Sequence, residues 1–247
     1  MKTALVFAAL FLGAPIHALA RPLHVIVDPG HGGTDAGAVH DGLKESDIVL
    51  KVSKHLASLL QKDSRFKVTL TRQKNSTMSL SERTNLAREV RGDVFLSIHV
   101  NSAIEGNPKG AELYFQNQMP PDEESRWLAS RENAGAESLD TSKTKGDVPN
   151  IIDDLKRSYH THLSFSLVRH IRNTWSKTGA VPAIRQGPFH VLYEVAMPSA
   201  LVELGFLTHP QESKWLASPE TQRTLAQILY EGLVQFKEKL DKQRPKS

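Results

Sequence analysis

Four side chains that can bind a metal ion or move a proton stand next to predicted secondary-structure elements. His31 follows one short apolar run, His99 lies near the end of another, and Glu203 lies near the end of a third. Glu45 stands where an amphipathic segment begins. Two imidazoles and one carboxylate can hold zinc with the fourth ligand position open to water, and a further carboxylate can serve as general base. A lone histidine after a strand more often has a structural role, so the metal hypothesis requires that these residues meet.

The elements that would position these side chains alternate between strands and helices. Strands are expected at residues 23–27, 66–71, 94–100, 111–115, 189–193 and 200–204, and helices at residues 47–62, 79–91, 152–175 and 218–240. The helix at 79–91 opens with Ser79 and Glu82, the two residues of a capping box. This alternation is typical of a single α/β domain with a largely parallel sheet. Ligands of such sheets bind outside the carboxyl ends of the strands, where His31, His99 and Glu203 would converge.

The composition limits the chemistry that the chain can perform. Its 247 residues include no cysteine, which excludes a disulfide scaffold, an iron–sulfur cluster, thiolate-bound zinc and a cysteine nucleophile. Any metal site must therefore draw on the 11 histidines and 27 acidic residues. The net charge is only +4 and no long run of lysine or arginine occurs, so we expect no nucleic-acid partner.

The first twenty residues have the pattern of a secretory signal peptide. A basic start at Lys2 precedes an uncharged, mostly apolar stretch, and small residues at Ala18 and Ala20 match a signal-peptidase site. A membrane anchor is the alternative, but the apolar run of roughly 14 residues is shorter than the ~20 that span a bilayer. We therefore expect cleavage after Ala20 and an exported, monomeric chain of residues 21–247. It would be periplasmic or secreted and free of the membrane.

Seven short motifs occur in an order that resembles a known enzyme family. They are VDPGHGG (27–33), KES (44–46), LTR (70–72), LSER (80–83), SIHVN (97–101), PSALVELGFL (198–207) and PQE (210–212). Together they resemble the zinc-dependent N-acetylmuramoyl-L-alanine amidases of the amidase_3 family. The resemblance covers nearly all of the expected mature chain, and several motifs in the right order are far more specific than any one of them.

The resemblance implies a fold, a site and a reaction. The fold would be a twisted, mostly parallel six-stranded sheet flanked by helices. His31, Glu45 and His99 match the ligands of one zinc ion, and Glu203 matches the catalytic glutamate. The substrate would be the peptidoglycan amide that joins N-acetylmuramic acid to L-alanine of the stem peptide. Open alternatives are a zinc peptidase or deacylase acting on another amide, and a wall-binding protein without catalytic activity.

Two further hypotheses concern the surroundings of the metal ligands. Metal-bound histidines usually donate their second N–H group to an oxygen atom, and Asp28 and Asn101 are candidates for that role. Arg72 and Arg83 are interpreted as structural residues rather than substrate anchors.

A charged, serine-rich segment at residues 121–147 lies between the fourth strand and the long helix that follows. It resembles the start of an insertion that, in some Gram-negative family members, plugs the site until an activator protein moves it. Glu132 is then a candidate blocking ligand, and an activator acting on residues 121–147 is a candidate partner. The alternative is a surface helix beside the substrate groove.

Overall fold

The computed structural model describes residues 21–116, 122–135 and 151–243. The strands are β1 (Leu23–Pro29), β2 (Val39–His40), β3 (Leu43–Lys44), β4 (Phe66–Leu70), β5 (Val94–Asn101), β6 (Glu112–Gln116), β7 (Ala183–Gly187) and β8 (Ser199–Phe206). The helices are α1 (Glu45–Gln61), α2 (Leu80–Glu89), α3 (Glu123–Glu132), α4 (Ile151–Ser176), α5 (His190–Glu194), α6 (Pro210–Ala217) and α7 (Pro219–Gln243). The expected signal peptide, residues 1–20, and residues 136–147 of the expected insertion lie outside the described part.

Six strands form one sheet in the order β4-β1-β5-β8-β6-β7. Neighbouring strands are parallel except for β6 and β8, which pair antiparallel. The predicted α/β fold with a mostly parallel six-stranded sheet is therefore confirmed. β2 and β3 form a separate two-stranded hairpin just before α1.

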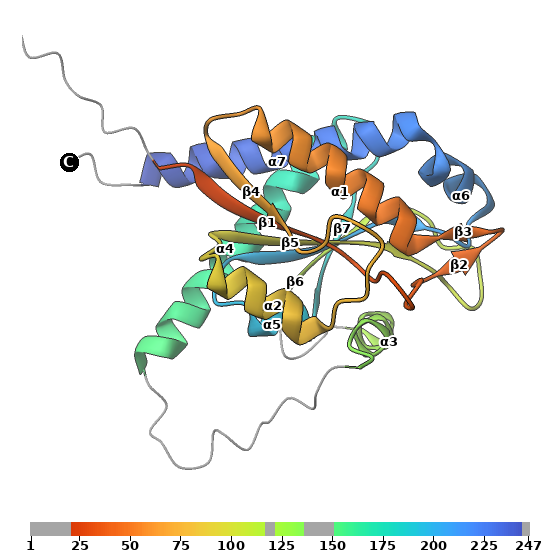
Figure 1. Cartoon of the computed structure of the whole chain (residues 1–247), viewed down its shortest axis with the longest axis horizontal. Helices are drawn as coiled ribbons and strands as arrows, with labels where there is room; N and C mark the ends of the chain where they lie inside the picture. The colour runs from red at the N-terminus through yellow and green to blue at the C-terminus, as the bar shows by residue number, and fades with distance from the viewer. Residues whose placement is uncertain (1–20, 117–121, 136–150, 244–247) are drawn as a thin grey trace, which may run out of the picture.

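Alternate residues of the central strands pack into two different cores. Val25 and Val27 of β1 pack with residues of α1, α4 and α7, whereas Ile26 packs with residues of α2, α3 and the segment around α5. Figure 1 shows these two groups of helices on opposite faces of the sheet. A parallel sheet with both faces covered explains why β1, β5 and β8 are buried along their whole length.

The expected strand at residues 189–193 is wrong. The strand lies earlier, at β7, and residues 190–194 form the short helix α5. Phe189 and Leu192 are almost fully buried in the second core, so the apolar pattern correctly indicated burial. A short apolar run does not distinguish a buried strand from one turn of buried helix, because both bury successive side chains.

Local signals were more reliable at helix starts. Ser79 and Glu82 form the reciprocal capping box that the sequence indicates, and α2 begins directly after Ser79. Among the described helices, none is long and apolar enough to cross a membrane.

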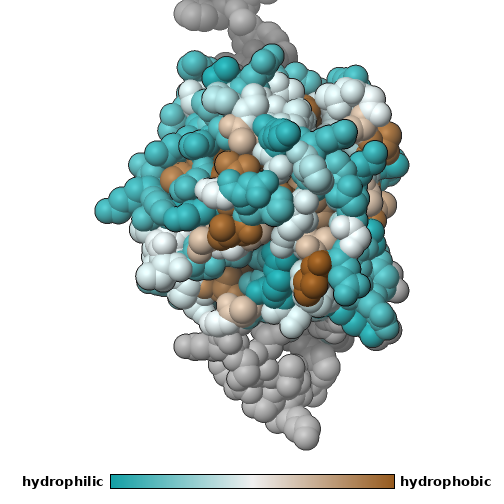
Figure 2. Space-filling view, turned by 90° about the vertical axis from the view of Figure 1, so that its right-hand side faces the viewer, coloured by the Kyte–Doolittle hydropathy of each residue, from teal (hydrophilic) through white to brown (hydrophobic). Residues whose placement is uncertain are grey.

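The carboxyl ends of β1, β5 and β8 point to the right-hand side of Figure 1, where β2, β3 and α6 also lie. Figure 2 faces this side and shows apolar residues interspersed with hydrophilic ones. Ile104 and Trp127 are two large apolar residues with substantial exposure in the described part of the chain.

Candidate metal centre

The side chains with metal-binding chemistry lie together at the carboxyl ends of the central strands. His31 follows β1 in the glycine-rich turn, and His99 on β5 pairs in register with Glu203 on β8. Glu45 is the first residue of α1 and is fully buried. His31, Glu45 and His99 each offer one ligand atom, and these atoms all lie within 4.8 Å of one another. The convergence expected at the carboxyl ends of the strands is therefore present.

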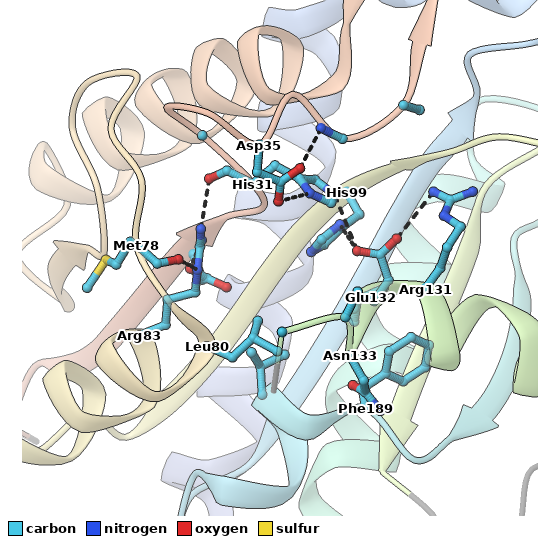
Figure 3. A pocket seen from close by; sticks show the side chains of 18 of the residues that line it. His31, Asp35, Met78, Leu80, Arg83, His99, Arg131, Glu132, Asn133 and Phe189 are labelled. Atoms are coloured by element: carbon cyan, nitrogen blue, oxygen red, sulfur yellow. Dashed lines mark hydrogen bonds and ion pairs between the residues drawn. The ribbon is translucent and has the colours of Figure 1, made fainter. Parts of the chain in front are cut away.

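Two carboxylate oxygens, one from Glu45 and one from Glu132, contact the same two imidazole nitrogens. Oε1 of Glu45 lies 3.2 Å from Nε2 of His31 and 3.0 Å from Nδ1 of His99. Oε2 of Glu132, from α3, lies 3.2 Å and 3.1 Å from the same two nitrogen atoms. Figure 3 shows the carboxylate of Glu132 next to the ring of His99.

These four spacings are similar to those between the ligands of a zinc ion. Zinc bonds to nitrogen and oxygen of about 2.0–2.1 Å place neighbouring ligand atoms of a tetrahedral site about 3.3 Å apart. The buried Nε2 atom of His31 also lacks a hydrogen bond of good geometry among the described residues. A buried, unsatisfied imidazole nitrogen that faces two carboxylates is a donor that a metal ion could use. His31, Glu45 and His99 could therefore hold zinc, and Glu132 lies beside both histidines.

The electrostatics of the cluster favour positive charge at its centre. Burial by itself would lower the pKa of both imidazoles, but the neighbouring carboxylates outweigh it and raise the pKa of His31 to about 12 and that of His99 to about 10. Burial would raise the pKa of Glu45, yet the two histidines hold it at about 2. Two carboxylates facing two imidazoles would equally attract a divalent cation.

Glu203 differs from the other carboxylates of the site. It is fully buried, and neither of its oxygen atoms has a hydrogen-bond partner among the described residues. Burial is the main cause that raises its pKa well above the usual range, and the negative charges of Glu45 and Glu132 add to that effect. A carboxyl group with a raised pKa is suited to accept and return a proton near neutral pH.

At two positions near the ligands, the backbone lies so close to a ligand side chain that only glycine fits. A Cβ atom on Gly30 would overlap with the ring of His99. Gly37 has a positive φ of 64°, and a Cβ atom there would lie 2.5 Å from Oε2 of Glu45. His31 itself has a φ of 55°, a left-handed conformation that non-glycine residues adopt rarely and mostly where surrounding contacts enforce it.

The oxygen partner of His31 is a residue that sequence analysis missed. Nδ1 of His31 lies 2.7 Å from Oδ2 of Asp35, which leaves Nε2 facing Glu45. Asp35 also accepts a hydrogen bond from the N–H group of Gly37, so the carboxylate joins both ends of the turn. Its position four residues after His31 in the same turn is the signal that could have identified it.

The two residues expected in this role have other partners, so that expectation is corrected. Asp28 accepts hydrogen bonds from the hydroxyl groups of Thr71 and Ser97 and from Arg83. Asn101 donates to Glu112 at 3.2 Å. Asp28 lies within β1 rather than after it, and its side chain lies among these donors, so no bond to either histidine forms.

Two buried arginines fix the segments that carry the ligands. Arg72 donates to the carbonyl oxygens of Pro29, Gly30 and Ser46. Arg83 donates to Asp28 and to the carbonyl oxygens of Pro29 and His31. Both guanidinium groups bond mainly to backbone carbonyl oxygens of the protein itself, in agreement with a structural role.

Helix α3 covers the site and is not a surface helix at the side of the groove. Leu128 and Ala129 are buried in the second core, and Arg131 donates to the carbonyl and hydroxyl oxygens of Ser102. Asn133, which caps the helix, binds the backbone on either side of Phe189. A pocket of about 770 Å³ is lined by both histidines and by residues 131–135 at the end of α3.

Comparisons with known proteins agree with this arrangement. The family model described as Amidase_3, N-acetylmuramoyl-L-alanine amidase, matches residues 25–235. The probable N-acetylmuramoyl-L-alanine amidase AmiB of Haemophilus influenzae is 32% identical over 248 residues, which cover 96% of this chain and 57% of that protein. AmiC of Escherichia coli, an N-acetylmuramoyl-L-alanine amidase, is 29% identical over 86% of this chain and 52% of its own length. The chain thus spans about half the length of these two relatives.

A solved structure of similar fold is that of N-acetylmuramoyl-L-alanine amidase AmiC2 of Nostoc punctiforme. It is 27% identical to this chain, superimposes with a TM-score of 0.65, and is matched over 87% of this chain and 97% of its own.

Proposed function

Because this chain belongs to the Amidase_3 family of N-acetylmuramoyl-L-alanine amidases, we propose that it hydrolyses peptidoglycan with the help of zinc. The bond cleaved is the amide between N-acetylmuramic acid and L-alanine of the stem peptide. The observation that carries this proposal is the cluster of His31, Glu45 and His99 beside the buried, unpartnered carboxyl group of Glu203. That cluster combines a three-ligand metal site with a separate proton carrier, as metal-assisted hydrolysis requires.

The proposed roles divide between holding the metal and moving protons. His31, Glu45 and His99 would hold the zinc ion, which would supply an activated water molecule and polarise the substrate carbonyl. Glu203 accepts a proton from the attacking water and returns it to the departing amine of L-alanine. Asp35 holds the imidazole of His31 in the orientation that turns Nε2 toward the metal.

We also propose that α3 blocks the site in the form described here. Glu132 occupies the position that substrate or water would need, and its side chain is only 5% exposed. The substrate carbonyl reaches the site only after Glu132 withdraws. An activator protein acting on residues 121–147 would therefore raise activity by stabilising a conformation in which α3 has moved.

A zinc peptidase acting on another amide would use the same residues, so substrate profiling distinguishes the two activities. Against a wall-binding protein without catalysis, the chain retains His31, Glu45 and His99 together with Glu203, a carboxyl group that is costly to bury without a function. The proposal also keeps residues 1–20 as a signal peptide, which would direct the protein to export, and it separately keeps the expectation of a monomer.

Mass analysis of digested peptidoglycan, with and without a chelator, tests the function. Purified protein should release stem peptides with a free L-alanine amino terminus, and a chelator should stop the release. Fragments cut at a peptide bond within the stem would indicate the peptidase instead. Binding to peptidoglycan with no released product, even after Glu132 is replaced by alanine, would indicate the wall-binding protein.

A further inference from the structure

The side-chain amide of Asn133 pairs with two backbone groups at the edge of the pocket. Its Nδ2 donates to the carbonyl oxygen of Pro188 at 2.8 Å, and its Oδ1 accepts from the N–H group of His190 at 2.7 Å. These two backbone groups flank Phe189 and have no other hydrogen-bond partner among the described residues. Figure 3 shows Asn133 next to Phe189, below the Glu132 carboxylate.

The Pro188 carbonyl and the His190 N–H group are arranged like the free hydrogen-bonding groups at the edge of a β-sheet. Phe189 is extended, with φ of −73° and ψ of 125°, and it lies two residues beyond the end of β7, the edge strand of the sheet. In a parallel pair, the carbonyl before a residue and the N–H group after it both bond to one residue of the neighbouring strand. Pro188 and His190 present that carbonyl and that N–H group around Phe189.

We propose that the Pro188 carbonyl and the His190 N–H group form a subsite for the main chain of one stem-peptide residue, bound in extended conformation. Asn133 occupies this subsite in the closed form as a mimic of that residue. This inference rests on the proposed function and specifies how its substrate is held. It is a strand-addition mode of recognition, in which main-chain hydrogen bonds hold the peptide.

The geometry of the amide group favours the peptide over the sugar as the occupant. The N–H and C=O groups of one extended residue point to the same side, as do the N–H and oxygen of the asparagine amide that bind here. The acetamido group of a sugar is a trans amide, so its N–H and C=O point in opposite directions. One acetamido group therefore cannot bond to both backbone groups, whereas one peptide residue can.

The position of the subsite relative to the metal centre supports the same reading. Glu132 and Asn133 are consecutive residues, and both line the pocket that contains His31, His99 and Phe189. One occupies the metal position and the next occupies the subsite, so a substrate that places its scissile amide at the metal would bring a nearby peptide residue to Phe189. The ring of Phe189 is fully buried and packs edge-on against Tyr114 at 5.0 Å, which holds the segment in place without substrate.

Replacement of His190 by proline tests the subsite by deleting a single N–H group. Phe189 already has the extended conformation that precedes proline, and proline is favoured at the first position of a helix, where His190 lies. His190→Ala is the matched control, because it removes the same buried side chain and keeps the N–H group. Both changes are made in a chain that also carries Glu132→Ala and Asn133→Ala, so that α3 no longer competes for the site.

The readouts are KM and kcat for a synthetic muramyl tripeptide. Relative to His190→Ala, His190→Pro should raise KM about 3- to 10-fold, the range of one hydrogen bond of ordinary strength, with kcat changed less than about twofold. Equal KM values in the two variants would overturn the subsite. A fall in kcat alone would also overturn it, because it would indicate distortion of the catalytic residues.

Substrate modification gives a test that does not depend on the folding of a variant. The tripeptide is methylated at one peptide nitrogen at a time, and its Kd is measured by calorimetry on the chain that carries Glu132→Ala, Asn133→Ala and Glu203→Gln. Methylation at one position should weaken binding about 3- to 10-fold, because it removes the donor to Pro188. Equal binding of every methylated compound would overturn the subsite. If the tripeptide binds with this pattern but the chain that carries Glu132→Ala and Asn133→Ala, with Glu203 intact and zinc bound, never cleaves it, the proposed function fails and the subsite stands.

Discussion

The Glu132 carboxylate lies 3.1 Å from Nδ1 of His99, which joins the end of α3 to a central strand of the sheet. Glu132 makes a second contact of this kind with His31, while Glu45 faces the same two nitrogen atoms. A carboxylate shared by both histidines competes with water and substrate for the same position. The accessibility of the site therefore depends on whether α3 stays in place.

Replacement of Glu132 by alanine should raise the basal release of stem peptides. The change removes the contacts with both histidines, and each 1.4 kcal/mol lost from the closed form shifts the equilibrium toward the open form about tenfold. We expect at least a tenfold rise in the initial rate on purified peptidoglycan. Glu123→Ala is the control, because it removes an equal charge from an exposed position at the other end of α3. Equal rates for the two variants would show that Glu132 does not block the site.

Replacement of Glu203 by glutamine should abolish most turnover without loss of the metal. Glutamine has the same shape but cannot accept a proton, and general-base catalysis typically contributes about 10²- to 10⁴-fold. The measurements are zinc content by elemental analysis and peptide release in the Glu132→Ala background. Full activity would assign the proton transfer to another residue, and loss of zinc would make Glu203 a ligand.

Much of the fold followed from local patterns. The capping box of Ser79 and Glu82 and the buried strands that precede His31 and follow Pro198 depend on neighbouring residues, so periodicity and capping rules predicted them. The segment at residues 189–193 was predicted incorrectly as a strand, because a buried strand and a short buried helix have similar runs of apolar residues.

The surroundings of the site were harder to predict. Asp35 contacts His31 in a turn where His31 takes a left-handed conformation, and the spacing of four residues was the one sequence signal for this pair. The contact between Glu132 and His99 joins segments more than 30 residues apart, and only the family resemblance pointed to it. Local patterns therefore indicated which edge of the sheet holds the site, but not the second partner of each ligand.

Replacement of Asp35 by asparagine should weaken zinc binding. One carboxylate oxygen of Asp35 contacts His31 and the other accepts the N–H group of Gly37. Asparagine has only one oxygen atom for these two contacts and carries no negative charge. Loss of such a partner typically costs 10- to 100-fold in metal affinity. Competition against a chromophoric chelator measures the change. Asp41→Asn, an equal change at an exposed position in the following turn, should leave the affinity unaltered, and equal affinities for the two variants would remove Asp35 from the metal site.

Arg185 on β7 anchors the other end of α3. Its guanidinium group bonds to the buried Glu112 at 2.7 Å and reaches Asp122 at 2.7 Å and Glu124 at 3.1 Å. Asp122 also caps α3 by accepting the N–H group of Ser125. One arginine thus ties the first turn of the helix to the edge of the sheet.

Replacement of Arg185 by glutamine should therefore raise basal activity, by less than the Glu132 change. The ion pairs with α3 are partly exposed, and such pairs are worth up to about 1 kcal/mol, which corresponds to a rise of roughly 2- to 5-fold. Added salt screens exposed charges, so it should activate the unmodified enzyme more than the variant. Arg65→Gln, which breaks an ion pair with Asp63 far from α3, is the control. If Arg185→Gln and Arg65→Gln respond alike to salt, the anchoring of α3 does not depend on Arg185.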